Sequence, residues 1–300
     1  MNNKKFNNFC IFYVRNFELI ITINLLLTIA ILITLLINAE KLIDFDMRYI
    51  VLPCGIYFGI LFSSYLILKK KLIKFFKNKY IYLAFKNEYK NFSYNPNGNF
   101  NINLFDFLNS KEFNKKTQDN ISGLHNGYKF NQNTIKVEII YETRDTFTNV
   151  KEDKSISIFD GIITEFKLKN TYKKILIYTN DLHFDLEDKN MQRNIKIDNE
   201  NFNNHFTTNA TSKEDVILFL DDKMINTLTQ AEKKLLCSSF FIYIVNNKLF
   251  IGQNCSSNLF DPNFKRKQNE QKIIKYYKEK MEFSNYIINN FDLEKEEYDY

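Results

Sequence analysis

SISIFDGIITEFKL, residues 155–168, is the stretch that decides how the larger part of the chain folds. Apolar side chains recur at every second position through Ile156 and Ile158 and resume at Ile163, a spacing typical of a β-strand with one buried face. Gly161 interrupts this alternation, as a β-bulge would. The segment therefore predicts a long strand within a sheet.

Further strands are expected on both sides of this segment. Tyr128–Tyr141 alternates in the same way, Tyr172–Tyr178 is typical of a third strand, and Asn194–Ile197 begins a fourth. Farther along, Leu236–Val245 and Lys248–Gly252 flank the pair Asn246-Asn247. Because asparagine tolerates left-handed backbone conformations, we expect these two runs to form a hairpin.

Helical spacing occurs at three places in the same region: Leu104–Lys116, Asp221–Lys234 and Gln268–Phe291. The run DVILFL at residues 215–220 is expected to lead into the second of these helices. The third is amphipathic, with one apolar stripe made of Ile273, Ile274, Tyr277, Met281 and Ile288. Together these patterns predict an α+β domain with a mainly antiparallel sheet and flanking helices.

Two uncharged runs, Leu19–Ala39 and Tyr49–Leu68, precede this domain. Each is long enough, at about 1.5 Å per helical residue, to cross a hydrocarbon core about 30 Å thick. They predict an N-terminal two-helix transmembrane hairpin. A cleaved signal peptide is the alternative for the first run, but its apolar stretch exceeds the roughly 7–15 residues usual there, and Ile37-Asn38-Ala39 is not a convincing cleavage site.

The net charge of +6 is unevenly distributed. Residues 81–300 hold 30 basic and 31 acidic residues, which argues against a nucleic-acid partner. Lysines without an intervening acid follow the second apolar run: Lys69, Lys70, Lys71, Lys74, Lys77 and Lys79. They either fix the topology or attract anionic lipid, at about 1 kcal/mol each near the surface. We expect a two-pass protein of the cell (inner) membrane with both termini cytoplasmic.

The expected domains are therefore residues 1–80, a hairpin with a basic juxtamembrane segment, and residues 81–300, a cytosolic α+β domain with a C-terminal amphipathic helix and an acidic tail. In the second apolar run, Gly55, Gly59 and Ser63 share one helical face. Small residues let helices approach closely in lipid, so this face is expected to pack on the first helix or on a second copy.

Motifs that carry chemistry are scarce in the sequence. It lacks the phosphate-binding, dinucleotide-binding, nucleophile-elbow and zinc spacings, and it predicts neither a catalytic residue nor a cofactor. Asp181, His183 and Asp185 would share one strand face and could ligate a divalent metal, although a solvated connection is the simpler interpretation.

The remaining histidines and two of the cysteines are expected to have ordinary roles. His125 and His205 stand alone and are interpreted as turn or surface residues. Cys237 and Cys255 are expected to approach each other across the predicted hairpin as thiols.

Short motifs between Asp119 and Asp261 carry a family resemblance. They are Ile121-Ser122-Gly123, Phe159-Asp160-Gly161, Asn201–Phe206 with its F-x-x-x-F spacing, the segment Ala210–Leu228 and Phe260-Asp261-Pro262. In these residues the chain resembles the bacterial DUF3137 family, a domain of unknown function found behind paired transmembrane helices. The resemblance implies no catalytic residue. It implies a membrane setting and a LemA-like membrane protein as a possible partner.

Three functional hypotheses follow. The first is a non-enzymatic, membrane-anchored scaffold or interaction module that binds another membrane protein or itself. The second is an enzyme that acts on lipid or another membrane-delivered substrate near Asp181–Asp185. The third is an accessory subunit of a transporter that docks through Gly55, Gly59 and Ser63.

Overall fold

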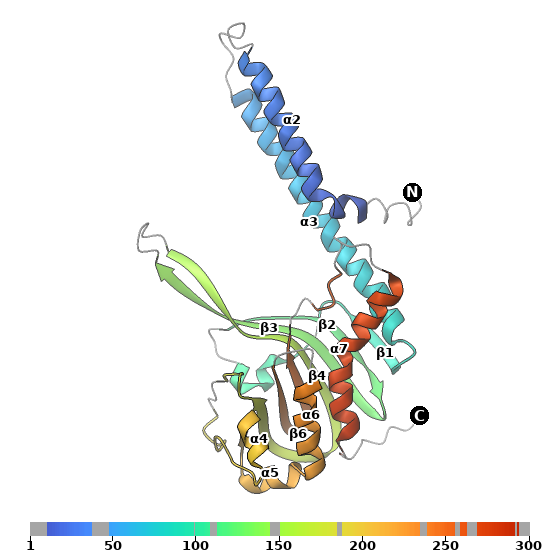
Figure 1. Ribbon diagram of the computed structural model, residues 1–300, viewed down its shortest axis with the longest axis vertical. Helices are drawn as coiled ribbons and strands as arrows, with labels where there is room; N and C mark the ends of the chain where they lie inside the picture. The colour runs from blue at the N-terminus through green and yellow to red at the C-terminus, as the bar shows by residue number, and fades with distance from the viewer. Residues whose placement is uncertain are drawn as a thin grey trace. The chain divides into compact units, whose positions relative to one another are not determined.

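The computed structural model describes residues 11–37, 48–98, 100–108, 113–144, 151–184, 188–234, 239–255, 259–262, 269–291 and 293. It confirms an α+β fold with a mainly antiparallel sheet and flanking helices (Figure 1). The chain divides into two compact units. One contains residues 1–79 and 261–270, and the other contains residues 80–260 and 271–300.

The first unit is built on α2 (Phe17–Ile37) and on most of α3 (Arg48–Phe85). Aromatic and polar side chains join the two helices. The rings of Phe17 and Tyr65 stack with their centroids 3.8 Å apart, and the Tyr57 hydroxyl donates to Asn24 Oδ1 at 2.9 Å. The hairpin is therefore held by rings and hydroxyls at these contacts.

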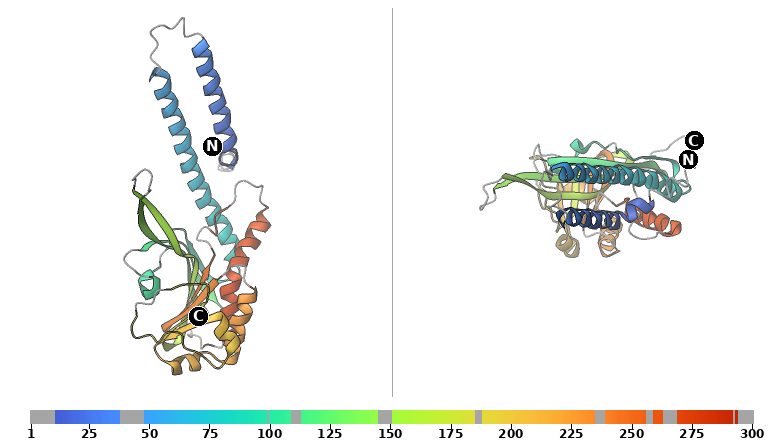
Figure 2. Two further views of the ribbon diagram at one scale, coloured as in Figure 1. Left: turned by 60° about the vertical axis from the view of Figure 1, so that its left-hand side comes forward. Right: turned by 90° about the horizontal axis from the view of Figure 1, so that it is seen from above.

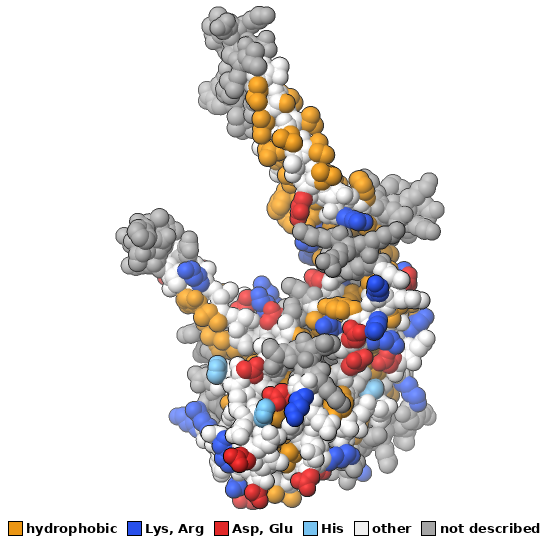
Figure 3. Space-filling model, in the orientation of Figure 1, with side chains coloured by type: hydrophobic (Ala, Val, Ile, Leu, Met, Phe, Trp, Pro, Cys, Tyr) orange, Lys and Arg blue, Asp and Glu red, His pale blue; other side chains and the backbone are white. Residues whose placement is uncertain are grey.

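Large apolar side chains remain exposed along both helices, as the orange surfaces in Figure 3 show. They include Leu19, Leu26, Ile31, Ile56, Ile60 and Ile67. No helix in the described ranges is both long enough and apolar enough to span a membrane. The two-pass topology stays a prediction.

The second unit is a six-stranded sheet. Its strands are β1 (Lys90–Asn95), β2 (Phe113–His125), β3 (Tyr128–Arg144), β4 (Lys151–Thr179), β5 (Phe206–Ala210) and β6 (Ser239–Asn254). They pair in the order β1-β2-β3-β4-β5, with β6 also on β4, and every pairing is antiparallel. β4 is thus the strand around which the sheet is built.

The strands predicted at 155–168 and 172–178 are one strand, β4, whose pairing with β6 is irregular between Lys167 and Ile175. The predicted bulge at Gly161 was misplaced. The register with β3 shifts between Val137 and Glu138 instead, whereas Gly161 pairs regularly with β3 and β6. Glycine is required there because an added Cβ would lie 1.8 Å from the carbonyl oxygen of Gln253.

The predicted hairpin at Asn246-Asn247 was wrong. Asn246 does adopt a left-handed conformation, with φ 57°, but the chain continues in the same direction and β6 pairs with β4 on both sides of it. Asn246 therefore marks an irregularity within one strand. Cys237 lies outside the described residues, and without a hairpin the expected approach of Cys237 to Cys255 has no basis.

The helices of the second unit are α4 (Glu200–His205), α5 (Lys213–Phe219), α6 (Asp222–Lys234) and α7 (Glu270–Asn290). The last two confirm the predictions. Residues 215–220, which were expected to lead into α6, lie mostly in a separate helix, α5, whose first turn Ser212 caps by accepting from the Asp215 amide. No strand forms at Asn194–Ile197.

The helix predicted at Leu104–Lys116 was also wrong. Two short 3₁₀ segments, η2 (Ile102–Leu104) and η3 (Asp106–Leu108), are followed by β2 from Phe113. The segments supply Phe105 and Phe107 to an aromatic core on one face of the sheet. Figure 2 shows them on the opposite side of the sheet from α6 and α7.

Candidate functional site

The structure describes two of the three residues that were weighed as a metal site. Asp181 lies in the turn after β4 and His183 lies on irregular backbone; both are exposed, with buried Leu182 between them. Asp185 lies outside the described residues. Within the described ranges, no three His, Cys, Asp or Glu side chains are grouped so that they could hold a metal ion.

The predicted small-residue face does not pack on α2. A Cβ added at Gly55 or at Gly59 would meet nothing within 4 Å, and Ser63 is exposed. The contact with α2 uses other faces of α3, through Tyr57 and Tyr65. The expectation was packing on the first helix or on a second copy, and packing on a second copy stays a prediction.

The lysines of the basic segment of α3 differ in burial. Lys77 is 5% exposed, and its Nζ lies 2.5 Å from Oδ1 of Asp261. Lys79 contacts Glu270 at 3.5 Å on the surface. Lys77 is therefore a buried structural cation rather than a lipid-facing one, whereas Lys69, Lys70, Lys71 and Lys74 are exposed.

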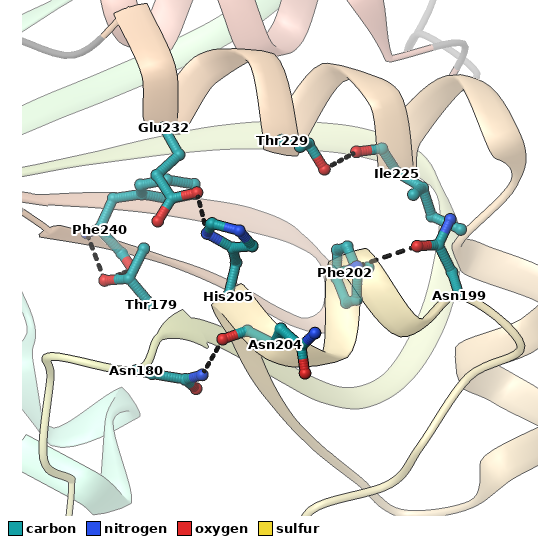
Figure 4. Close-up of polar contacts among 10 residues, drawn as sticks. All are labelled: Thr179, Asn180, Asn199, Phe202, Asn204, His205, Ile225, Thr229, Glu232 and Phe240. Atoms are coloured by element: carbon teal, nitrogen blue, oxygen red, sulfur yellow. Dashed lines mark hydrogen bonds and ion pairs between the residues drawn. The ribbon is translucent and has the colours of Figure 1, made fainter.

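His205, which the sequence left without a partner, faces Glu232 of α6 with 2.8 Å between Nδ1 and Oε2 (Figure 4). Next to it, Asn180 donates to the carbonyl oxygen of Asn204 at 2.8 Å. Both contacts tie the end of α4 to its neighbours. We interpret them as structural, because they close the junction between α4 and β5 over the buried ring of Phe202.

A hollow of about 460 Å³ on the sheet is lined mostly by polar and charged side chains. We call it the amide-lysine hollow. Its lining residues are Asn120, Ser122, Lys129, Phe130, Asn131, Glu165, Lys167 and Lys248. They come from β2, β3, β4 and β6, the four strands that lie next to one another here.

Strand register explains why these side chains meet. Ser122 is the partner of Asn131, Asn131 is the partner of Glu165, and Lys167 is the partner of Lys248. Directly paired residues project to the same face of a sheet. This is the face that carries the aromatic core, because Phe250 is the partner of Glu165 and belongs to that core.

A turn and a bulge shape one wall of the hollow. The turn at Asn95-Pro96-Asn97-Gly98 packs against β2 so closely that a Cβ on Gly98 would lie 2.6 Å from the Gln118 nitrogen. β2 then shifts register between Gln118 and Ile121, and Asp119 takes a left-handed conformation with φ 53°. Such backbone in a non-glycine residue is uncommon, and it clusters at functional sites.

The bulge buries the Asp119 carboxylate and directs Asn120 to the hollow. Asp119 is fully buried and accepts a hydrogen bond of 2.8 Å from the Tyr94 hydroxyl. The Asn120 amide donates to Asn131 Oδ1 and, at 3.2 Å, to Asn133 Oδ1. Three asparagines therefore form a hydrogen-bonded group that fixes the orientation of the wall.

Most of the charged residues that line the hollow are lysines. Three lysines and one glutamate line it, a formal charge of +2. Lys248 contacts Glu165 at 2.8 Å, so one of the three lysines is paired within the lining. Lys129, which is exposed, makes no ion pair with any residue in the described ranges.

The opposite face of the same strands is supported by a buried polar group. Thr164 donates to Gln132 Oε1 at 3.1 Å and lies 3.0 Å from the Ser284 hydroxyl of α7. Gln253 also donates to Ser284, at 3.2 Å. These contacts anchor α7 to β3, β4 and β6, and they give the hollow a rigid floor.

Comparison with known proteins bears on part of this unit. The model of the DUF3137 family, described as a protein of unknown function, matches residues 157–293. Residues 157–293 form a DUF3137 domain. The predicted family is thereby confirmed. Of the expected motifs, Ile121-Ser122-Gly123 lies outside the matched residues, and the other four lie within them: Phe159-Asp160-Gly161, Asn201–Phe206, Ala210–Leu228 and Phe260-Asp261-Pro262.

Among curated proteins no match was found. One similar solved structure is the crystal structure of the mycobacterial trehalose monomycolate transport factor A, TtfA. It has a TM-score of 0.35 and 8% identity, over 69% of this chain and 95% of that chain.

The motifs of the DUF3137 domain have structural roles here. Phe202 and Phe206 are buried, with their ring centroids 4.7 Å apart, and Asp261 pairs with Lys77. The amide-lysine hollow was missed from the sequence. Its one local signal is the run Asn131-Gln132-Asn133, which places three polar residues inside an otherwise alternating strand.

Proposed function

We propose that the chain is a membrane-attached, non-catalytic interaction module that binds its ligand or partner in the amide-lysine hollow. The observation that carries this proposal is the convergence of asparagine, serine and lysine side chains from four strands on a hollow of about 460 Å³. Binding sites for small molecules usually have volumes of roughly 300–1,000 Å³.

A binding role fits the chemistry of the lining better than a catalytic one. Amides and ammonium groups donate and accept hydrogen bonds and supply charge, and the eight lining residues include neither a histidine nor a cysteine. The strained bulge at Asp119 and the hydrogen-bonded asparagines hold these groups in place before a ligand arrives. Such preorganisation lowers the entropic cost of binding.

The membrane part of the proposal rests on α2 and α3. Their large apolar side chains are exposed, and exposed apolar surface of this extent is typical of a site for lipid or another apolar partner. The exposed lysines Lys69, Lys70, Lys71 and Lys74 adjoin it. We propose attachment to the cell (inner) membrane with both termini cytoplasmic, and a LemA-like membrane protein as one partner to examine.

Fractionation tests the membrane attachment. Chain that stays in the membrane pellet after washes in high salt and in alkaline carbonate is inserted, whereas release by salt alone would mean that only the lysines hold it. Thiol labelling from each side at single cysteines placed in residues 1–10 and 40–47 then tests the topology. Labelling of both segments from the same side would refute the hairpin.

Cross-linking tests the interaction role. A stoichiometric partner should be recovered with the wild-type chain and lost when Asn131→Leu blocks the hollow. Lys154→Ala, a change at an exposed lysine on the projecting part of β4, is the matched control and should retain the partner. Equal recovery with both variants would remove the hollow from the proposal.

A role as an accessory subunit of a transporter is the second candidate. It is favoured by the open space around Gly55 and Gly59, which leaves that face of α3 available to another helix. Gly59→Leu should then abolish complex formation without changing membrane attachment. An unchanged complex would exclude this face as the docking surface.

A further inference from the structure

We infer that two copies of the chain form a twofold dimer in which β4 of one copy pairs with β4 of the other, along a ribbon that projects from the sheet. This contact is a second interaction surface, separate from the amide-lysine hollow. Three observations carry the inference: an open edge of β4, an apolar stripe that continues outwards from the core, and the order of the charged residues along β4.

The far ends of β3 and β4 form a two-stranded ribbon. Within the described residues, β2 pairs with β3 only as far as Ile139, and β6 pairs with β4 only from Gly161 onwards. Beyond these points, Ile140–Arg144 pairs with Lys151–Ser155. Figure 1 and Figure 2 show this ribbon projecting from the rest of the sheet. Because a two-stranded ribbon is only marginally stable in water, an added strand would stabilise it.

The edge of β4 that faces away from β3 is the one open to a new strand. β6 covers this edge up to Asp160, whose carbonyl oxygen accepts from the Cys255 amide at 2.8 Å. By Phe260 the chain lies against α7, where the Tyr277 hydroxyl donates to the Phe260 carbonyl oxygen at 2.7 Å. In the part of the chain that the structure describes, no strand pairs with Lys151–Ser157 on this edge. Such an edge is a template for pairing with another chain.

An apolar stripe runs from the core onto one face of the ribbon. Val137 and Phe159 are paired and buried in the aromatic core, and the next apolar pair on that face is Ile139 with Ile156. Tyr141 continues the stripe, two residues after Ile139. Ile156 is 53% exposed and Tyr141 is 38% exposed. The stripe therefore leaves the core and ends in solvent, as apolar surface at a protein contact does.

The order of residues along β4 suits a copy of the same strand at one register. In a symmetric antiparallel pair, one residue lies opposite its own copy. A centre on Asp153 or on Lys154 would place like charges opposite each other, which is destabilising. A centre on Ser155 places Lys154 opposite Ile156 and Asp153 opposite Ser157, so no like charges meet. It also places the two copies of Ile156 diagonally next to each other, which joins the two apolar stripes.

The balance of charge favours a second copy over a lipid surface. Lys151-Glu152-Asp153-Lys154 contains two bases and two acids, so it offers no net charge to anionic lipid. Across the ribbon, the Lys151 ammonium lies 2.8 Å from a carboxylate oxygen of Glu142. A surface of balanced charge is complementary to another of the same kind, and a second copy supplies one.

Sedimentation of the full chain in neutral detergent tests the dimer. The wild type should sediment as a dimer, and Ile156→Lys should raise its dissociation constant by at least about tenfold, because the change adds a positive charge opposite Lys154 twice in each dimer. Combining it with Lys154→Glu should restore the dimer, since opposite charges then meet. Leu218→Lys, at an α5 residue that is 84% exposed, is the matched control and should change nothing. A monomeric wild type, or no rescue by the double variant, overturns the inference.

Cross-linking of the wild-type chain locates the contact without any substitution. Isotope-labelled and unlabelled chains are mixed, treated with an amine-reactive cross-linker and digested for peptide mass spectrometry. Links that join Lys151 or Lys154 of a labelled copy to Lys154 of an unlabelled copy should be recovered. Mixed-label links confined to the lysines of α3 would assign the dimer to the hairpin and overturn the inference.

The dimer and the proposed function fail separately. Asn131→Leu should leave the dissociation constant unchanged, because Asn131 lines the hollow and lies outside the ribbon. Ile156→Lys should in turn leave recovery of the hollow's partner unchanged. Equal loss of the dimer in both variants would reflect a general loss of fold and would overturn the ribbon contact.

Discussion

Removing the carboxylate of Asp261 should destabilise the first unit more than a substitution in a loop usually does. The Lys77 side chain is 6% exposed and that of Asp261 is 32% exposed, with 2.5 Å between Nζ and Oδ1. Breaking a fully buried ion pair costs about 3–5 kcal/mol, and breaking a surface pair costs about 0–1 kcal/mol. Because water reaches Asp261 in part, we expect Asp261→Leu to cost about 2 kcal/mol.

Thermal unfolding of the full chain in neutral detergent, followed by far-UV circular dichroism, measures this cost. A loss of about 2 kcal/mol corresponds to a Tm lower by about 4–8 °C for a domain of some 150–250 residues. Glu270→Gln is the matched control, because Lys79 and Glu270 are 42% and 49% exposed and 3.5 Å apart. It should lower Tm by no more than about 2–4 °C.

A second variant separates the ion pair from other effects of changing the loop. Lys77→Met combined with Asp261→Leu removes both charges, so the double variant should regain most of the stability that Asp261→Leu loses. Equal losses for Asp261→Leu and Glu270→Gln, or no recovery in the double variant, would refute the buried pair. Lys77→Met should also leave binding to anionic vesicles unchanged, whereas Lys74→Ala should weaken it.

Three further outcomes are expected. In denaturant unfolding, Gln132→Met should leave the free energy of unfolding unchanged or raise it by up to about 1 kcal/mol, because Gln132 Nε2 is buried without a hydrogen-bond partner. Ser284→Ala should instead lower it by about 1–3 kcal/mol, because the change removes a hydrogen-bond partner of Gln253 and Thr164. Gly161→Ala should cost at least about 1–3 kcal/mol because its Cβ would meet the Gln253 carbonyl at 1.8 Å, and Gly55→Ala, with nothing within 4 Å, should not destabilise the fold. Burial lowers the pKa of His125 from 6.5, although its hydrogen bond to Asn289 and the charge of Glu88 act in the opposite direction. The folded state therefore binds the proton less readily than the unfolded state, and the stability of the fold should decrease as the pH drops below about 6.5. Measurements of Tm against pH should show this dependence in the wild type and not in His125→Asn.

Local periodicity sufficed for the elements whose buried face is set by their own sequence. β3 was predicted over Tyr128–Tyr141, and α7 over Gln268–Phe291 with the buried stripe of Ile273, Tyr277 and Met281. In each, one face packs continuously against the rest of the unit, so the spacing of apolar residues records that packing directly.

Elements whose form depends on a distant partner were predicted wrongly. The Asn246-Asn247 pair does contain left-handed backbone, but whether such a residue turns the chain or only bulges it is decided by the neighbouring strand. Here β4 continues past it and pairs with β6 on both sides. The prediction of a helix at Leu104–Lys116 was wrong for the same reason. Phe105 and Phe107 pack in the core of the sheet, and their apolar character does not mark one face of a helix.

The candidate site could not be assembled from the sequence because its residues are far apart in the chain. Asn120 and Lys248 line the same hollow, although more than a hundred residues separate them. Only the registers of β2 on β3, β3 on β4 and β4 on β6 bring them together. The sequence could offer Asp181, His183 and Asp185 as a metal candidate because local spacing is the kind of proximity that a sequence displays directly.

The boundary of the DUF3137 domain passes through the hollow. Glu165, Lys167 and Lys248 lie within residues 157–293, whereas Asn120, Ser122, Lys129, Phe130 and Asn131 lie before them. Removing the earlier residues would also take β3 from the edge of β4 over Phe130–Arg144 and expose that edge. The hollow is therefore a property of the six-stranded sheet and not of the DUF3137 domain alone, so chains that have this domain but different strands in front of it need not have the hollow.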